Sequence, residues 1–221
     1  MRFDDAEDWC PHPIRVYDLE TGDPEDFVVC AGDGDYGVFP SSYGGGLFVG
    51  VDHFDFDSCR TNICITFWDS SGGEIDIPAN PYPCPAVWHE FPDWTPCELG
   101  ARVSPDGRLL AYRFRPDNKW PCPEYGDVLY EDWLMESRKT VGEVVVLDIE
   151  TGAVIYQASS PAEERLTDFD GRYLVLTTTD RRWDVPIDER DREATSTIVD
   201  ITGNSPDHTV DGRVHLIWTL D

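Results

Sequence analysis

The stretch VSPDGRLLAY (residues 103–112) decides the fold class of this chain. Its Asp-Gly pair stands between two apolar runs, which is a strong short-range signal for a β-hairpin with a tight turn. A second stretch, VVVLDIETG (144–152), again joins an apolar run to an aspartate and a glycine turn. Together the two stretches predict four strands, at roughly 100–104, 108–114, 143–149 and 153–158.

Similar stretches recur along the chain, which indicates a structural repeat. The order of apolar strand, aspartate and glycine turn occurs in IRVYDLETG (14–22), ITFWDSSG (65–72), VVVLDIETG (144–152) and TIVDITG (197–203). A glycine-turn hairpin also precedes the pattern in TDFDGRYLVL (167–176) and, more loosely, in SYGGGLFVG (42–50). The marker aspartates Asp18, Asp69, Asp148 and Asp200 are 51, 79 and 52 residues apart, so the third unit carries one long insertion. Each complete unit is expected to hold four strands, a to d, with tight a–b and c–d turns.

The third unit, with SPDGRLLA followed by VVLDIETG, resembles the WD40-like, TolB-type β-propeller repeat, and the fourth unit resembles it too. The first two units match only at the aspartate and glycine turn. The resemblance implies an all-β fold, a β-propeller-like array of about four four-stranded antiparallel blades, in a partial or small propeller with long loops on one face. The expected units of this single domain are roughly 1–31, 32–80, 81–160 and 161–221. Another hairpin-built meander or sandwich is the alternative, and propellers host too many roles for the fold to name a function.

The two ends of the chain make the number of blades uncertain from sequence. Only 13 residues precede the first c strand, too few for strands a and b, so the opening unit is half a blade. The stretch RVHLIWTL (213–220) is expected to be a strand, either the last d strand or the a strand of another blade. We favour the C-terminal part of a longer propeller. The alternative is a small ring in which 213–220 joins 14–18.

The lengths of the connections predict where function lies. In a meander of this kind the short a–b and c–d turns share one end, and the long b–c and d–a connections share the other, where variable loops carry function. Six of the eight tryptophans lie outside the predicted strands. Aromatic rings stack on sugars or grip peptides, and carboxylates take hydroxyl groups or cations. The candidate ligand-binding residues are Trp88, His89, Trp94, Trp120, Tyr125, Trp133, Arg182 and Trp183. Alternatively, these rings pack on one another as small cores beneath their own loops.

The seven cysteines favour a disulfide framework, because four of them adjoin proline and therefore belong to loops. The short loops that they close suggest the pairs Cys59–Cys64 and Cys84–Cys97, and the odd number leaves one thiol over. The framework implies an extracytoplasmic or secreted protein, with a cytoplasmic location as the alternative. A zinc site is the second interpretation of the cysteines, although no Cys-x-x-Cys pair is present.

The charge of the chain excludes several classes of partner. Acidic residues number 44 against 17 lysines and arginines, which gives a net charge of −27. A surplus of this sign excludes general nucleic-acid binding and argues against docking on anionic lipid. The chain has no apolar run of about 18 residues, so no membrane insertion is expected, and no signal peptide is visible. Adaptation to high salt is one explanation of this composition. An acidic protein from a high-GC genome, which uses arginine in place of lysine, is the simpler explanation.

Asp52, Asp55 and Asp57 are weak candidates for metal binding, because carboxylates at alternate positions suit calcium. Solvated acids are the simpler interpretation, and apart from this calcium no cofactor is expected. The chain has no Gly-x-Ser-x-Gly, Walker or dinucleotide glycine motif.

Three functional hypotheses follow. The first is a non-catalytic binding or scaffold propeller that recognises a glycan, protein or peptide ligand through the aromatic, acidic loop face. The second is a propeller-type hydrolase or lyase that uses loop carboxylates, with or without calcium. The third is a structural part of a larger ring with no site of its own.

Overall fold

The structure is a computed structural model that describes residues 14–17, 24–27, 40–54, 62–84, 98–115, 141–161, 164–178 and 194–216. Within these ranges the regular structure is entirely β, with fourteen strands and no helix. No helix that is long and apolar enough to cross a bilayer occurs among these residues.

Twelve of these strands form three four-stranded antiparallel sheets, in each of which consecutive strands pair. The first sheet contains β3 (Pro40–Gly44), β4 (Leu47–Phe54), β5 (Asn62–Asp69) and β6 (Glu74–Ile75). The second contains β7 (Glu98–Val103), β8 (Leu109–Arg115), β9 (Gly142–Asp148) and β10 (Val154–Ser160). The third contains β11 (Glu164–Phe169), β12 (Tyr173–Thr178), β13 (Thr195–Asp200) and β14 (His208–Asp211). The strands β1 (Ile14–Tyr17) and β2 (Pro24–Phe27) form a separate antiparallel pair.

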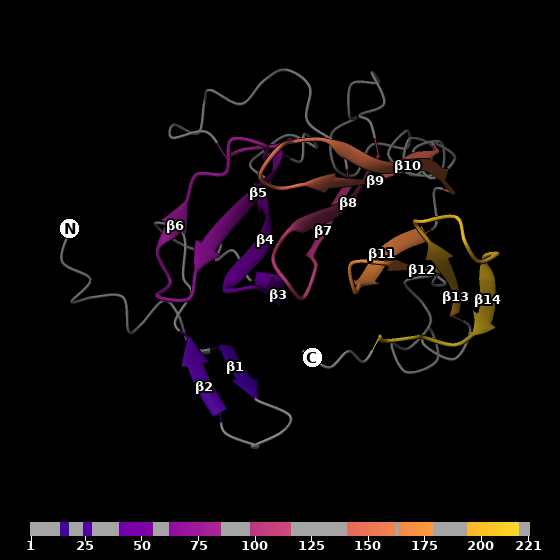
Figure 1. Ribbon diagram of the computed structural model, residues 1–221, viewed down its shortest axis with the longest axis horizontal. Coiled ribbons are helices and arrows are strands. Elements are labelled where there is room, and N and C mark those ends of the chain that lie inside the picture. The colour runs from indigo at the N-terminus through magenta and orange to yellow at the C-terminus, as the bar shows by residue number, and fades with distance from the viewer. Residues whose placement is uncertain are drawn as a thin grey trace, which may run out of the picture.

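The three sheets follow one another in chain order around a common inner side (Figure 1). The first strand of each sheet is innermost, and β7 contacts both β3 and β11. Serine side chains of β3 fix this junction, because Ser41 Oγ donates to the Ala101 carbonyl (2.9 Å) and Ser42 Oγ accepts from the Val103 amide (3.1 Å). The arrangement is that of propeller blades, so the predicted all-β, propeller-like array is confirmed.

The core consists of two apolar layers, one on each face of the second sheet. Between the first and second sheets the buried side chains include Val49, Ile65, Phe67, Leu110 and Leu147. Between the second and third sheets they include Ala111, Val144, Val146, Leu174 and Leu176. Burial of each large aliphatic or aromatic side chain stabilises the fold by about 1.5–3 kcal/mol. The second sheet has apolar residues on both faces because it lies between two others, which explains the uninterrupted run VVVL in β9.

The marker aspartates of the sequence repeat have a structural role in the c–d turns. Asp69 Oδ1 accepts the Ser71 amide (2.8 Å), Asp148 Oδ1 accepts the Thr151 amide (2.8 Å), and Asp200 Oδ1 accepts the Thr202 amide (3.0 Å). In each turn the hydroxyl group of the same serine or threonine also donates to this carboxylate oxygen. The a–b turns use an aspartate in the same way, since Asp106 accepts the Arg108 amide and Asp170 the Arg172 amide. The repeat pattern is therefore a pattern of turn stabilisation.

The turn hydrogen bonds stabilise the charged form of the aspartates, so we expect the protein to lose stability in acid. Hydrogen bonds from Arg172 and then Thr202 hold the pKa of Asp200 far below its usual range, and turn hydrogen bonds also lower the pKa of Asp69 and Asp148. A carboxyl group whose pKa is lowered in the folded state stabilises the protein at pH values above its unfolded pKa of about 3.9. This stabilisation is lost as the pH falls further. We therefore expect the free energy of unfolding to fall below about pH 4 in urea titrations at several pH values.

Asp200→Asn should flatten this acid dependence, because Asp200 is buried and bonded to Arg172 Nη2 (2.9 Å). Asp207→Asn, at an exposed position just before β14, is the matched control and should leave the dependence as it is in the wild type. An unchanged slope in Asp200→Asn would show that this carboxylate is not a source of the acid sensitivity.

The four strands predicted for the third unit agree with β7 to β10 to within two residues at each end. One prediction for the stretch 213–220, that it supplies the last d strand, was wrong. The d strand of the last sheet is β14 (His208–Asp211), so 213–220 does not supply it, and residues 213–216 form no strand. Instead this segment crosses towards β11, where the Leu216 amide donates to Asp168 Oδ2 (2.8 Å). The alternative in which 213–220 joins 14–18 is not seen for residues 213–216, and residues 217–221 are outside the described ranges.

The first and second sheets are in direct backbone contact at one pair of turns. The Gly45 amide donates to the Pro105 carbonyl (2.7 Å), so the β3–β4 turn contacts the β7–β8 turn through the backbone. A Cβ atom on Gly44 would overlap the Ser104 carbonyl oxygen. The glycine run in SYGGGLFVG is therefore required by close packing as well as by the positive φ of Gly45 and Gly46 (56° and 80°).

Candidate functional site at the loop end

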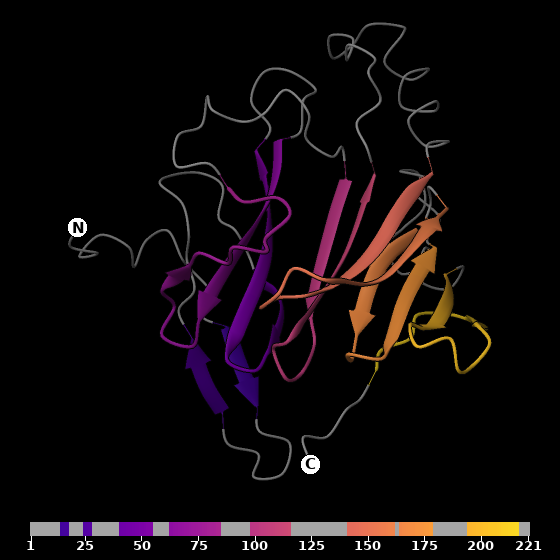
Figure 2. The same ribbon diagram turned by 45° about the horizontal axis from the view of Figure 1, so that its top comes forward.

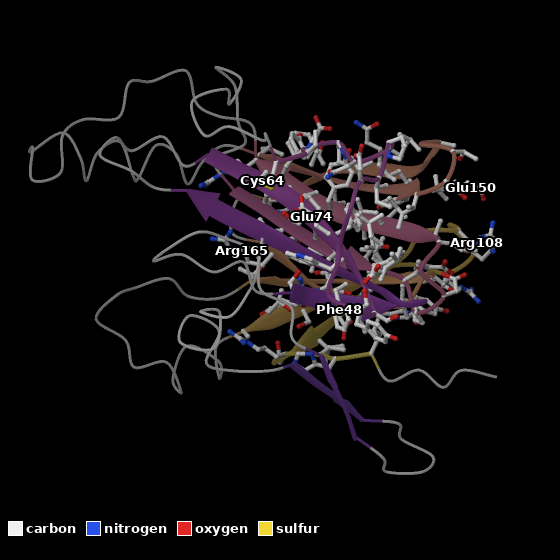
Figure 3. All side chains as sticks on the ribbon, turned by 90° about the vertical axis from the view of Figure 1, so that its left-hand side faces the viewer. Phe48, Cys64, Glu74, Arg108, Glu150 and Arg165 are labelled. Carbon is white, nitrogen blue, oxygen red and sulfur yellow. A yellow bond between two sulfur atoms is a disulfide. The ribbon has the colours of Figure 1, made fainter. Side chains whose placement is uncertain are left out.

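The three sheets have two unlike ends. The turn end carries the tight hairpin turns, and the β7–β8 and β11–β12 turns both lie at the lower side of Figure 2. At the loop end the strands begin or finish next to the long connections, as the pairs Glu98↔Arg115, Phe114↔Glu143 and Glu164↔Thr178 record. In Figure 3, Cys64 and Arg165 lie towards the loop end, and Arg108 and Glu150 lie at the turn end. The described residues that flank 85–97, 116–140 and 179–193 thus share one end of the molecule.

Most of the predicted site residues are outside the described ranges. This applies to all the ligand-binding candidates, Trp88, His89, Trp94, Trp120, Tyr125, Trp133, Arg182 and Trp183, and to Asp55, Asp57, Cys59 and Cys97. Asp52 belongs to β4, where its Cα pairs with Cys64 of β5. Among the residues that the structure describes, no three His, Cys, Asp or Glu side chains gather as a possible metal site. The residues that the structure does bring together are Cys64 and Cys84.

The cysteine pairing proposed from loop lengths was wrong. Cys64 forms a disulfide with Cys84, and the pairs Cys59–Cys64 and Cys84–Cys97 are both incompatible with this bond. The physical reason is that the chain returns after β6 and runs beside β5, with Ile65 and Pro83 in a parallel bridge. This contact brings Cys84 next to a strand that is 20 residues earlier in the sequence. The presence of a disulfide is compatible with an extracellular location.

Residues 80–84, which we call the strap, are also attached to β5 without the disulfide. The Ile65 amide donates to the Tyr82 carbonyl (2.7 Å), and Asn80 Nδ2 donates to the Ile65 carbonyl (2.8 Å). The Thr66 hydroxyl lies 3.0 Å from Cys84 Sγ. The strap therefore lies beside residues 64–66 of β5 and ends where the connection 85–97 begins.

The strap also joins the first sheet to the second through three aromatic rings. The ring centroid of Tyr82 lies 5.9 Å from that of Tyr112 and 5.8 Å from that of Phe114, both of β8. Burial raises the pKa of Tyr82 well above its usual range and also raises that of Tyr112, and the nearby Glu143 carboxylate adds to both effects. The two phenols are therefore neutral at physiological pH, and their rings pack as apolar groups. They are not candidate bases.

A buried polar network joins the second and third sheets at the loop end. Arg113 of β8 is 1% exposed; its Nε donates to Ser160 Oγ (2.8 Å) and its Nη2 to the Pro161 carbonyl (2.7 Å). The Ser160 hydroxyl in turn donates to Glu164 Oε2 (2.9 Å). Gly142 makes room for the guanidinium, since a Cβ there would lie 2.9 Å from Arg113 Nη2. We call these residues the seam network. It fixes the short link from β10 to β11.

A second arginine lies nearer the turn end between the inner strands. Arg102 of β7 donates from Nε to the Thr167 carbonyl (3.1 Å) and from Nη1 to the Ala101 carbonyl (2.7 Å). Burial lowers its pKa, and the Asp168 carboxylate works against that shift. Asp168 also lies 3.8 Å from His215 Nδ1. This arrangement ties β7, β11 and the C-terminal segment together, which is a structural role.

Arg113, Ser160, Glu164 and Tyr82 were not among the residues predicted from the sequence. One signal was available: in LLAYRFR (109–115) the alternation that buries Leu109 and Ala111 towards the third sheet also puts Arg113 on that face. A charged residue at a position of this kind requires a buried partner. Its partners are 47 and 48 residues away, so the sequence alone does not identify them.

Comparisons with known proteins give limited similarity. No protein-family model and no curated protein matches the chain. A solved prolyl endopeptidase structure is similar, with 17% identity over 80% of this chain and 22% of that chain, and a TM-score of 0.40. TolB from Acinetobacter baumannii is similar with 15% identity over 90% of this chain and 38% of that chain, also with a TM-score of 0.40. The chain thus spans well under half the length of either protein.

Proposed function

We propose that this chain is a non-catalytic binding module of the propeller type, and that its ligand is held at the loop end. The observation that carries the proposal is the contrast between the two ends of the sheets. At the turn end the aspartate side chains and the turn amides bond to each other. The described strand ends at the loop end flank the connections that contain Trp88, Trp120 and Trp183.

The base of the loop end supports this proposal because it is held at several points. The seam network fixes the second sheet to the third, and the strap and its disulfide fix the first sheet to the second. Binding residues are commonly carried on loops that a rigid scaffold positions. Because the base is rigid, the loops have less conformational entropy to lose when a ligand binds.

The proposed ligand is a glycan or an extended peptide. Six of the eight tryptophans lie outside the predicted strands, and aromatic rings supply stacking surface for both kinds of ligand. The net charge of −27 favours a ligand that is neutral or cationic over an anionic one. We further propose that the protein is extracytoplasmic and that its repeats belong to the WD40-like, TolB-type family.

Binding to glycan and peptide arrays tests the proposal. Trp88→Ala and Trp94→Ala are each expected to weaken the affinity for any bound ligand by about tenfold or more, because buried aromatic contacts dominate such interfaces. The measurement is titration of the wild type and both variants with the array ligand, after circular dichroism has shown that all three are folded.

A pair of arginine variants supplies the matched control. Arg182→Ala removes a cation from a long connection, whereas Arg108→Ala removes one from the turn end, where the side chain is 73% exposed. Only the first should change binding. Equal affinities for wild type, Trp88→Ala and Trp94→Ala would contradict the proposal. Cleavage of an array ligand, detected by mass spectrometry, would favour a hydrolase or lyase instead.

A further inference from the structure

The two cysteines of the Cys64–Cys84 disulfide differ in their exposure to solvent. Cys64 of β5 is 1% exposed, whereas Cys84 is partly exposed at the end of the strap. A thiolate must approach one sulfur atom of a disulfide directly, so access decides which sulfur is attacked. Cys84 is the more exposed residue of the pair, so its sulfur is the expected point of attack.

The strap is also held by contacts other than the disulfide. The Ile65–Tyr82 and Asn80–Ile65 hydrogen bonds and the packing of Tyr82 on Tyr112 and Phe114 do not involve sulfur. None of the strands β7 to β14 depends on this bond for its pairing. Opening of the disulfide is therefore a local event at the edge of the first sheet.

We propose that the Cys64–Cys84 disulfide is a site of reversible thiol–disulfide exchange with a dithiol reductant, which enters at Cys84, and that its opening loosens the strap. The strap ends where the connection 85–97 begins, so reduction releases one anchor of the segment that contains Trp88 and Trp94. An effect of reduction on ligand binding rests on the proposed function. The exchange and the loosening do not.

The chemistry balances in two steps. A thiolate of the reductant attacks Cys84 Sγ, the bond to Cys64 breaks, and its electron pair and then a proton go to Cys64 Sγ. The second thiol of the reductant, as thiolate, attacks the reductant sulfur of this mixed disulfide and expels Cys84 as a thiolate, which is then protonated. The Thr66 hydroxyl, 3.0 Å from Cys84 Sγ, is placed to donate a hydrogen bond to that thiolate. Overall the reductant becomes a disulfide, and two cysteines gain two electrons and two protons.

This pathway requires a dithiol. With a monothiol, the mixed disulfide at Cys84 stays next to the Cys64 thiol, which reforms the original bond and expels the monothiol. An intramolecular reaction of this kind has a high effective concentration and outcompetes a second monothiol from solution. The second thiol of a dithiol is equally intramolecular, so it can complete the reduction.

Peptide-resolved alkylation under native conditions tests the exchange. At equal total thiol concentration, dithiothreitol is expected to make Cys84 reactive, with the 1% exposed Cys64 labelled only after denaturant is added. With 2-mercaptoethanol the labelling of Cys84 should be at least about tenfold less. The far-UV circular dichroism signal should stay that of the folded protein. Equal labelling by the two reagents would overturn the dithiol mechanism, and labelling only after loss of the dichroism signal would overturn a local opening.

Hydrogen exchange tests the loosening of the strap. After reduction, and in Cys64→Ala/Cys84→Ala, the Ile65 amide, which donates to the Tyr82 carbonyl, should exchange faster. The amides of β12 should exchange at the wild-type rate and serve as the control. Unchanged exchange at Ile65 in both samples would overturn the loosening even if alkylation succeeds. Loss of ligand binding is measured separately, so its absence would count against the proposed function alone.

Discussion

Arg113→Leu is expected to lower the free energy of unfolding by about 3–5 kcal/mol, the cost of breaking a buried, hydrogen-bonded charge from one side. The variant removes the hydrogen bonds from Nε to Ser160 and from Nη2 to the Pro161 carbonyl. In the wild type the Ser160 hydroxyl connects the Arg113 guanidinium to the Glu164 carboxylate, which is 9% exposed. The variant removes the guanidinium and leaves this carboxylate buried. Urea denaturation followed by tryptophan fluorescence measures the change.

Two comparisons separate charge from packing in this result. Arg108→Leu makes the same substitution on an exposed side chain of the turn end and should change the free energy of unfolding by no more than about 0.5 kcal/mol. Arg113→Leu/Glu164→Leu removes both charges of the seam network, so it should be more stable than Arg113→Leu alone. If Arg113→Leu unfolds at the wild-type urea concentration, the network does not stabilise the junction of the second and third sheets.

Gly44→Ala is expected to destabilise the protein by about 3 kcal/mol, at the upper end of the usual cost of overpacking a rigid site. The new methyl group would overlap the carbonyl oxygen of Ser104, which is backbone and is itself bonded to the Gly107 amide. The first and second sheets would have to separate at the turn end, where the Gly45 amide bonds to the Pro105 carbonyl. Thermal and urea unfolding measure the loss.

Gly46→Ala is the matched control, because it lies in the same turn and has a φ of 80° but no atom near its would-be Cβ. It should cost only the backbone strain of a left-handed alanine, about 1 kcal/mol. Gly44 has no positive φ, so Gly44→Ala tests the sheet-to-sheet contact without that backbone strain. A loss in Gly44→Ala no larger than that in Gly46→Ala would show that the overlap is relieved at little cost.

The fold was predictable because its signals are local. Asp106, Asp148 and Asp170 bond to amides two or three residues further on, so the residues that make each turn are adjacent in the sequence. The aligned strand pairs follow from the turns, since a hairpin turn sets the register of its two strands. For this reason the strands β7 to β10 were placed within two residues of their observed ends.

The site was less predictable because its contacts are distant in the sequence. The partners of Arg113 lie 47 and 48 residues away, in a link between two sheets. The Cys64–Cys84 pair depends on the return of the chain along β5 after the two-residue strand β6, which no local pattern announces. Loop length was a poor guide to pairing, since it measures the distance along the chain and not the position of each cysteine on the sheet.

The meander order of every sheet also governs how the protein tolerates new sequence. Because consecutive strands pair, the ends of each connection are held by hydrogen bonds of the two strands that it joins. Loop-closure entropy grows only logarithmically, so doubling such a connection costs about 0.6 kcal/mol. Insertions between β8 and β9, or between β12 and β13, are thus nearly neutral for folding. Sequence variation can therefore change the length of these connections at the loop end. The tight turns at the turn end, which depend on Gly44 and Asp200, must keep their length.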